Sequence, residues 1–145
     1  MNKNFLIVLF ILFSLTCFYG CVKQTTKDDT LYNQLGGSEG LTTLVESFLY
    51  KIADNPKINH FFKDTDVLRF RNKLIEQWCE LSGGPCTYTG DNMLRTHAGQ
   101  EISDAHFNAL VEDLYIVMEE LNIPVSAQNK LLYELAPMRN EIVSK

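Results

Sequence analysis

One histidine in the second half of the chain stands in a setting that suits an iron ligand. Gly83-Gly84-Pro85 opens a glycine-rich turn that runs to Gly90, and the short segment His97-Ala98-Gly99 follows. A neutral imidazole is a good ligand for iron, and aromatic side chains such as those of Phe61-Phe62 can pack against a porphyrin. This arrangement of residues can therefore hold an iron porphyrin from one side.

Five short motifs follow one another in a fixed order, namely Leu35-Gly36-Gly37, Phe61-Phe62, Gly83-Gly84-Pro85, Tyr88-Thr89-Gly90 and His97-Ala98-Gly99. Their order and spacing resemble those of the group 1 truncated haemoglobins, over about Leu31 to Val143. The resemblance implies a two-over-two helical sandwich around a haem (iron protoporphyrin IX), with His97 as the proximal iron ligand. Helical periodicity by itself predicts only a small all-α domain.

The expected haem pocket takes residues from several helices. The resemblance places Phe62 flat on the porphyrin, although an ordinary core phenylalanine would also be buried there. The second ring nitrogen of His97 should donate a hydrogen bond to a carbonyl or a water, which fixes the tautomer. The expected pocket walls are Phe48, Phe61, Met93, Leu94, Phe107, Leu135 and Met138, and the candidates to meet the haem propionates are Arg71, Lys73, Tyr88 and Arg95.

The gas-binding side departs from the pattern of the resembled family. Many members place a tyrosine and a glutamine there, whereas the matching positions in this chain hold Leu49 and Leu74, with Phe70 at a third position. A hydrogen-bond donor beside dioxygen is worth about 1–3 kcal/mol. We therefore expect an apolar distal pocket, in which Gln77 and the indole of Trp78 are the residues able to supply a donor.

Lys73 lies three residues after Phe70 and has two interpretations. In the first, its side chain is solvated near a haem propionate. In the second, its amine coordinates the iron as a sixth ligand, which requires that desolvation and the metal remove its proton.

Composition restricts the broad class of the protein. The chain has 145 residues and is 46% hydrophobic, which allows one domain with a real core. The formal net charge of -5 excludes the basic footprint of a nucleic-acid-binding protein.

The first thirty residues predict export rather than a part of the fold. Residues 1–20 combine a lysine, an apolar run and small residues, as in a signal peptide, and Gly20-Cys21 resembles a lipoprotein cleavage site. Acylation of Cys21 would anchor the protein to a membrane of the cell envelope or periplasm, with 21–30 as a polar tether and 31–145 as the globin domain. Simple secretion and an uncleaved anchor are the alternatives.

Two cysteines remain after such processing, Cys79 and Cys86. They can pair across the turn that ends one helix, or they can stay as free thiols. Their spacing does not match a zinc site.

Apolar periodicity predicts four substantial helices and several short ones. We expect a short helix over 31–35, a helix from 41 to 54, a turn after Asn55-Pro56, and a helix from 67 to 81 that is capped from 64–66. Ser103 is expected to cap a long helix that ends at 122–124, and Ser126 to cap a last helix that continues to Ile142. His60 is expected to be exposed, and His106 to be structural.

These features leave several functions open. The preferred one is a carrier or scavenger of a diatomic gas, namely oxygen, nitric oxide or carbon monoxide. The alternatives are a haem redox enzyme or electron-transfer protein, which would need a partner reductase, a gas or redox sensor, and a haem-free lipoprotein that kept the fold. His97 and Phe62 argue against the last of these.

Overall fold

The computed structural model describes residues 29–145, and this part of the chain is helical, with no strand. The all-α prediction is thus confirmed. The predicted signal peptide over 1–20, the lipidation candidate Cys21 and most of the tether over 21–30 lie outside the described residues. The elements are α2 (Leu31–Gln34), α3 (Gly37–Asp54), η1 (Asn59–Phe62), α4 (Val67–Leu81), α5 (Met93–His97), α6 (Asp104–Glu120), α7 (Val125–Leu135), η2 (Ala136–Met138) and α8 (Arg139–Ile142).

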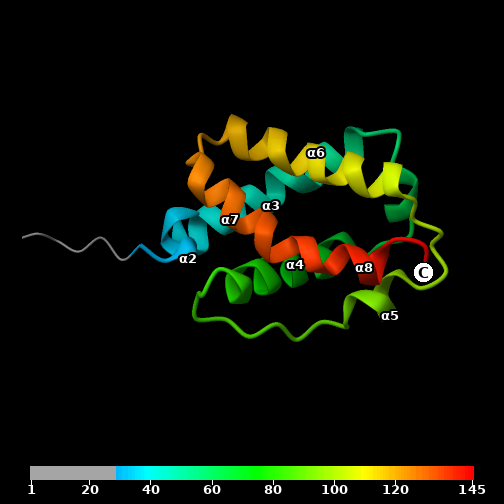
Figure 1. Cartoon of the computed structure of the whole chain (residues 1–145), viewed down its shortest axis with the longest axis horizontal. Helices are drawn as coiled ribbons and strands as arrows, with labels where there is room; N and C mark the ends of the chain where they lie inside the picture. Colours follow the sequence, from blue (N-terminus) through cyan, green and yellow to red (C-terminus); the bar gives the residue numbers. More distant parts are fainter. Residues whose placement is uncertain (1–28) are drawn as a thin grey trace, which may run out of the picture.

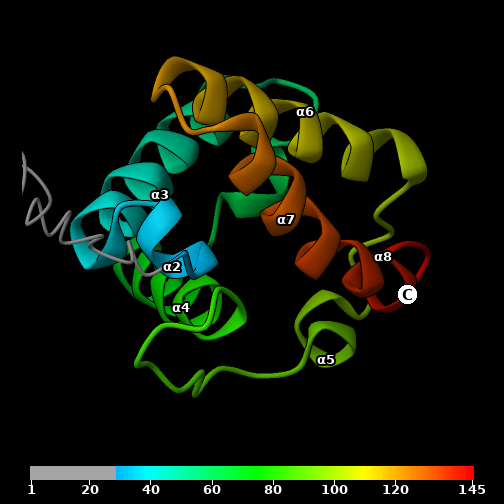
Figure 2. The same ribbon diagram turned by 60° about the vertical axis from the view of Figure 1, so that its left-hand side comes forward.

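The long helices form two layers, and α5 lies apart from them. The α3 helix packs against both α4 and α6, and α7 contacts α2 and α4. A long loop leads from α4 to α5, which contacts α8 near the carboxyl terminus (Figures 1 and 2). Among the described helices, none has the length and apolar character needed to cross a membrane.

Side-chain caps explain where the helices around the site begin. The Asp66 carboxylate accepts a hydrogen bond from the amide of Arg69 at 3.0 Å and starts α4, as expected from the 64–66 segment. The Ser103 hydroxyl accepts from the amide of His106, and the His106 ring accepts from the amide of Ser103 in return. His106 therefore has the structural role that was expected of it.

The last helix differs from its prediction at both ends. Pro124, not Ser126, is the residue before α7, and Ser126 lies within the first turn. The expected single helix to Ile142 is also wrong, because it is divided into α7, η2 and α8. Pro137 lies in η2 and has no N–H to donate, so the regular helical hydrogen bonds cannot continue through it.

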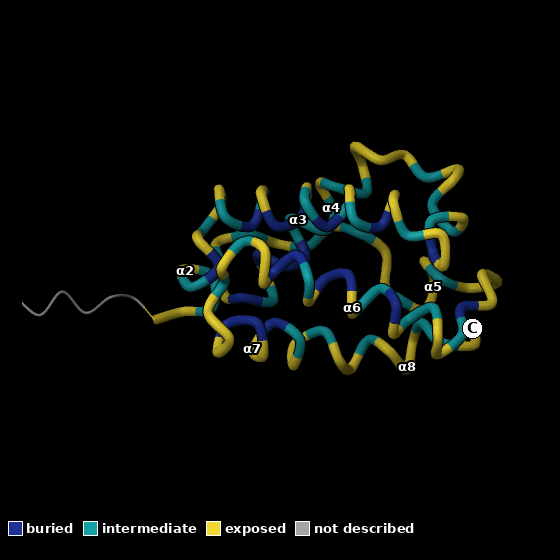
Figure 3. Tube along the Cα trace, turned by 90° about the horizontal axis from the view of Figure 1, so that it is seen from above, coloured by how far each residue is buried: buried dark blue, intermediate teal, exposed yellow. Residues whose placement is uncertain are grey.

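The core occupies one end of the molecule. Its buried side chains come mainly from α3, the second half of α6, and α7, and include Leu41, Leu44, Val45, Met118 and Leu131. In contrast, α5 and α8 contain no buried residue. In Figure 3, most of the dark blue segments lie along the long helices, and a few lie near the carboxyl terminus.

Candidate functional site

His97 is positioned by the single short helix α5. The side chain of Asn92 caps this helix by accepting from the amide of Arg95 at 2.8 Å. One turn further on, Nδ1 of His97 lies 2.8 Å from the carbonyl oxygen of Met93. A carbonyl can only accept, so Nδ1 carries the proton and Nε2 keeps its lone pair. The sequence led us to expect a carbonyl or a water as this partner, and the structure has the Met93 carbonyl. No described residue hydrogen-bonds to Nε2.

The expected gas-binding side of the site is made of aromatic and aliphatic side chains. The rings of Phe62 and Phe70 stack with their centroids 5.4 Å apart. The side chains at the two distal positions, Leu49 and Leu74, are half-buried. None of these four residues can donate a side-chain hydrogen bond.

A cavity of about 360 Å³ opens beside the Phe62–Phe70 stack, between α3, η1 and the start of α4. Most of its lining is apolar, so it suits an uncharged ligand better than an ion. Its lining residues are Leu49, Ile52, Ala53, Asn59, Phe62, Lys63, Thr65, Val67 and Phe70.

The two candidate distal donors both face other partners. Trp78 is 2% exposed and packs on Phe48, with ring centroids 5.5 Å apart, so both belong to the hydrophobic core. Gln77 is buried and its amide nitrogen lies 3.8 Å from the sulfur of Met93. Gln77 therefore reaches across to α5.

Two candidate propionate partners are held by carboxylates. Arg71 pairs with Glu46 on α3 at 2.6 Å. Lys73 lies 2.7 and 2.9 Å from the two Glu76 carboxylate oxygens and also donates to the Thr89 hydroxyl. The ammonium group of Lys73 is thus bound by Glu76 on α4 and by Thr89 of the loop that follows α4.

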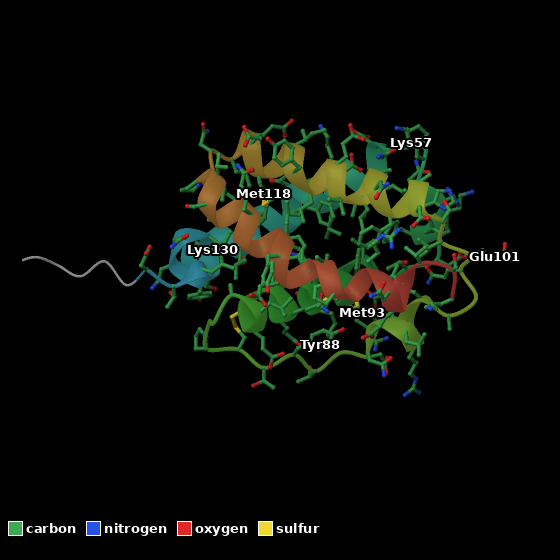
Figure 4. The ribbon with its side chains drawn as sticks, in the orientation of Figure 1. Lys57, Tyr88, Met93, Glu101, Met118 and Lys130 are labelled. Atoms are coloured by element: carbon green, nitrogen blue, oxygen red, sulfur yellow. A yellow bond between two sulfur atoms is a disulfide. The ribbon has the colours of Figure 1, made fainter. Side chains whose placement is uncertain are left out.

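The other two propionate candidates flank the loop before α5. Arg95 pairs with Asp91 at 3.6 Å and keeps most of its side chain in solvent, whereas the Tyr88 hydroxyl donates to the Asp91 carbonyl at 2.8 Å. Burial is the main cause that raises the pKa of Tyr88 above its ordinary value. Figure 4 shows Tyr88 on the loop below α4, and Met93 at the start of α5.

A disulfide joins Cys79 and Cys86, whose Cα atoms are 5.7 Å apart. Cys79 ends the buried stretch of α4, and Cys86 lies in the long loop. The sequence left open a disulfide or two free thiols, and the structure contains the disulfide.

The apolar side chains expected to line the haem pocket would fit a large, flat, apolar group. They come from η1, α4, α5, α6 and the carboxyl-terminal helices, and they are only half-buried although they are apolar. Leu94 is even 50% exposed. Such partial burial on several facing elements is expected where a cofactor completes the core. The half-buried residues are Phe61, Phe62, Phe70, Leu74, Met93, Phe107, Leu135 and Met138.

Sequence reasoning missed three residues that shape the site. Glu76 and Thr89 hold Lys73, and Asn92 caps α5. Asn92 could have been found, since asparagine directly before a short helical segment is a capping signal. Glu76 lies three residues after Lys73, which is a spacing for a helical ion pair.

Comparison with known proteins gives a consistent result. Residues 30–144 match the family model described as bacterial-like globin. The group 1 truncated hemoglobin of Tetrahymena pyriformis is 29% identical over 119 residues, which cover 82% of this chain and 98% of that protein. Its counterpart from Tetrahymena thermophila is 30% identical over 97 residues, covering 67% and 80%. The Fe(III) crystal structure of the T. pyriformis protein superposes with a TM-score of 0.77 and 29% identity, covering 80% of this chain and 99% of that one.

Proposed function

The chain belongs to the group 1 truncated hemoglobin family of the bacterial-like globins, and from this premise we propose that it acts at the cell envelope as a gas carrier or scavenger. Its cofactor is haem and its ligand is a diatomic gas. The observation that carries the proposal is the Nδ1 hydrogen bond of His97 to the Met93 carbonyl. It directs an unprotonated Nε2 away from the helix, as an iron ligand requires.

The haem iron supplies a coordination position for the gas, and the protein supplies its surroundings. His97 would hold the iron through Nε2, and the stacked rings of Phe62 and Phe70 would pack against the porphyrin. The cavity between α3 and α4 gives an uncharged molecule an apolar space beside this pair.

The apolar distal side determines which gas is held well. Leu49, Phe70 and Leu74 offer no donor, and Gln77 donates to Met93 instead. A gas that depends on a hydrogen bond, such as dioxygen, is therefore held weakly. Carbon monoxide and nitric oxide depend less on such a bond and are affected less.

The alternative of a six-coordinate redox or sensor globin requires a side chain that reaches the iron. Lys73 is the candidate, but Glu76 and Thr89 engage its ammonium group. This arrangement supports an open gas site. An enzymatic function that consumes electrons would also need a partner reductase.

We place the protein outside the cytoplasm, attached to a membrane through lipid on Cys21. The sequence pattern around Gly20-Cys21 supports this, and a disulfide between Cys79 and Cys86 is typical of oxidising compartments. In fractionated cells, Cys21→Ser should move the protein from the membrane to the soluble fraction. If it stays with the membrane, the anchor is an uncleaved segment and not a lipid.

Haem titration of the purified chain tests the central claim. We expect a Soret band that saturates at one haem per chain, and a His97→Gly variant that loses the haem unless imidazole is added. His60→Gly is the matched control, because His60 is exposed and should leave the Soret band unchanged. Full haem retention by His97→Gly without imidazole would contradict the assignment.

A further inference from the structure

We propose that two links between α4 and the following loop fix the position of α5, and therefore of His97. The links are the Cys79–Cys86 disulfide and the hydrogen bonds between Glu76 and Thr89. These four residues are called the loop brace below. The inference rests on the proposed haem function, because it assigns to the loop brace a role in holding the iron ligand.

The two links of the loop brace are parallel. Glu76 and Cys79 are three residues apart on α4, so they lie on the same side of the helix. Cys86 and Thr89 have the same separation in the loop. Oε2 of Glu76 accepts from both the Thr89 amide at 3.2 Å and the Thr89 hydroxyl at 2.8 Å. One link is covalent and the other is charge-assisted, so this stretch of the loop cannot slide along α4 while both hold.

The segment between the loop brace and α5 is short and is itself restrained. Only Gly90, Asp91 and Asn92 separate Thr89 from Met93. The Tyr88 hydroxyl donates to the Asp91 carbonyl, and the Tyr88 ring lies so close to Gly90 that a Cβ atom there would overlap it. The position of the loop brace is thus transmitted to the first residue of α5.

Met93 connects this segment to the iron ligand. Its carbonyl accepts the hydrogen bond from Nδ1 of His97, so a shift of Met93 turns the imidazole. Its sulfur also lies 3.8 Å from the amide nitrogen of Gln77, which follows Glu76 of the loop brace on α4. A chain of named contacts therefore runs from α4 through the loop to His97.

The helix α5 cannot hold this position by itself. It has five residues, none of them buried, and an isolated helix of this length is unstable in water. Its other attachment lies on the opposite side, where α5 contacts α8 and the Gly99 amide donates to the Lys145 carbonyl at 3.0 Å. The loop brace is consequently one of two attachments of α5 to α4, and the contact between Gln77 and Met93 is the other.

Haem dissociation from the loaded full chain tests the inference. Transfer of haem to an excess of an apoglobin should be about tenfold faster for Glu76→Gln and Thr89→Val, since each loses a hydrogen bond to a charged group. The Cys79→Ser/Cys86→Ser double variant should also lose haem faster. The conservative variant Thr89→Ser keeps the hydroxyl and should lose haem as slowly as the unaltered chain. Matched controls are Glu80→Gln and Thr87→Val, which change neighbouring exposed residues outside the loop brace.

Two further readouts separate positioning from a general loss of stability. In the reduced protein without gas, resonance Raman spectroscopy should show a shifted iron–histidine stretching band for Glu76→Gln and an unshifted band for Glu80→Gln. In the haem-free chain, amide hydrogen exchange of 93–97 should accelerate in Glu76→Gln while that of α3 does not. These readouts do not depend on gas binding.

The failure of the inference can be told from the failure of the proposed function. If the unaltered chain takes up no haem, or if the His97→Gly variant keeps its haem without imidazole, the proposed function is wrong. The loop brace then has no iron ligand to hold. If the unaltered chain binds haem through His97, but the loop-brace variants match their controls in haem loss and in the iron–histidine band, the inference alone is overturned.

Discussion

The amide nitrogen of Gln77 lies 3.8 Å from the sulfur of Met93, so the distal helix touches the first residue of the helix that carries His97. Spacing on α4 had made Gln77 a candidate donor to the gas. Its contact with Met93 engages Gln77 elsewhere, and the expected distal positions 49 and 74 hold leucines, which have no side-chain donor.

Placing a donor at position 74 should convert the pocket into one that retains dioxygen. Leu74→Gln adds an amide where the apolar side chain now lies, and the dioxygen dissociation rate should fall roughly tenfold, as expected for about 1–3 kcal/mol. Stopped-flow displacement of dioxygen measures this rate. Leu68→Gln is the control, because Leu68 is exposed on the same helix. Equal rates for the two variants would show that position 74 does not face the gas.

Removal of the Lys73 amine should leave the iron unchanged. Because Glu76 and Thr89 engage this amine, the reduced, gas-free protein should show one broad visible band, and Lys73→Ala should show the same band. Sharp split visible bands that disappear in Lys73→Ala would instead identify the lysine as a sixth ligand. Absorption spectroscopy after dithionite reduction distinguishes the two results.

The contribution of Glu76 to stability should depend on pH in one direction. The hydrogen bond from Lys73 is the largest cause that holds the pKa of Glu76 below its ordinary value of 4.5, followed by the Thr89 hydroxyl. Since the folded chain binds this proton less readily than the unfolded chain, the contribution is complete above that ordinary value and is lost as the pH falls through the lowered pKa. The difference in melting temperature between the unaltered chain and Glu76→Gln should therefore be largest near neutral pH and shrink in acid.

Thermal melts over a pH series measure this difference, with Glu80→Gln as the charge-matched control. A difference for Glu76→Gln that stays constant from neutral to acidic pH would show that its carboxylate charge does not stabilise the fold.

Loss of the disulfide should destabilise the chain as well as loosen the loop. For a loop as short as that between Cys79 and Cys86, its removal should lower the free energy of unfolding by about 2–3 kcal/mol. Denaturant unfolding of the Cys79→Ser/Cys86→Ser variant measures this value. Alkylation of the unreduced protein is the control, and modification of both thiols would mean that the bond does not form.

Sequence reasoning was most successful where local chemistry decides the structure. The caps at Asp66 and Ser103 and the apolar faces of the long helices follow from side chains within a few residues of one another. The setting of His97 in a short segment after the glycine turn was likewise visible, because the turn and the histidine are neighbours in the chain.

It was less successful where a side chain chooses among distant partners. Arg71 and Lys73 are candidates to meet the propionates, and the sequence did not show their protein partners, because Glu46 lies 25 residues before Arg71 and Thr89 lies 16 residues after Lys73. Such pairs depend on how α3 and the loop pack against α4, which spacing along one helix does not determine. Pro137 was overlooked although its missing N–H divides the last helix.

The uneven placement of the core has a consequence for how the protein matures. The half that contains α3, α6 and α7 has its own buried interior, whereas α5 and α8 add no buried residue of their own. A ligand that binds only the folded state stabilises it, and the stabilisation grows with the logarithm of the free ligand concentration once this exceeds the Kd. Bound haem would therefore give the α5 end the apolar packing that its own side chains do not provide. Newly made chains would therefore complete their folding only as fast as the cell delivers haem, and under iron starvation the α5 end would be the first part open to proteases.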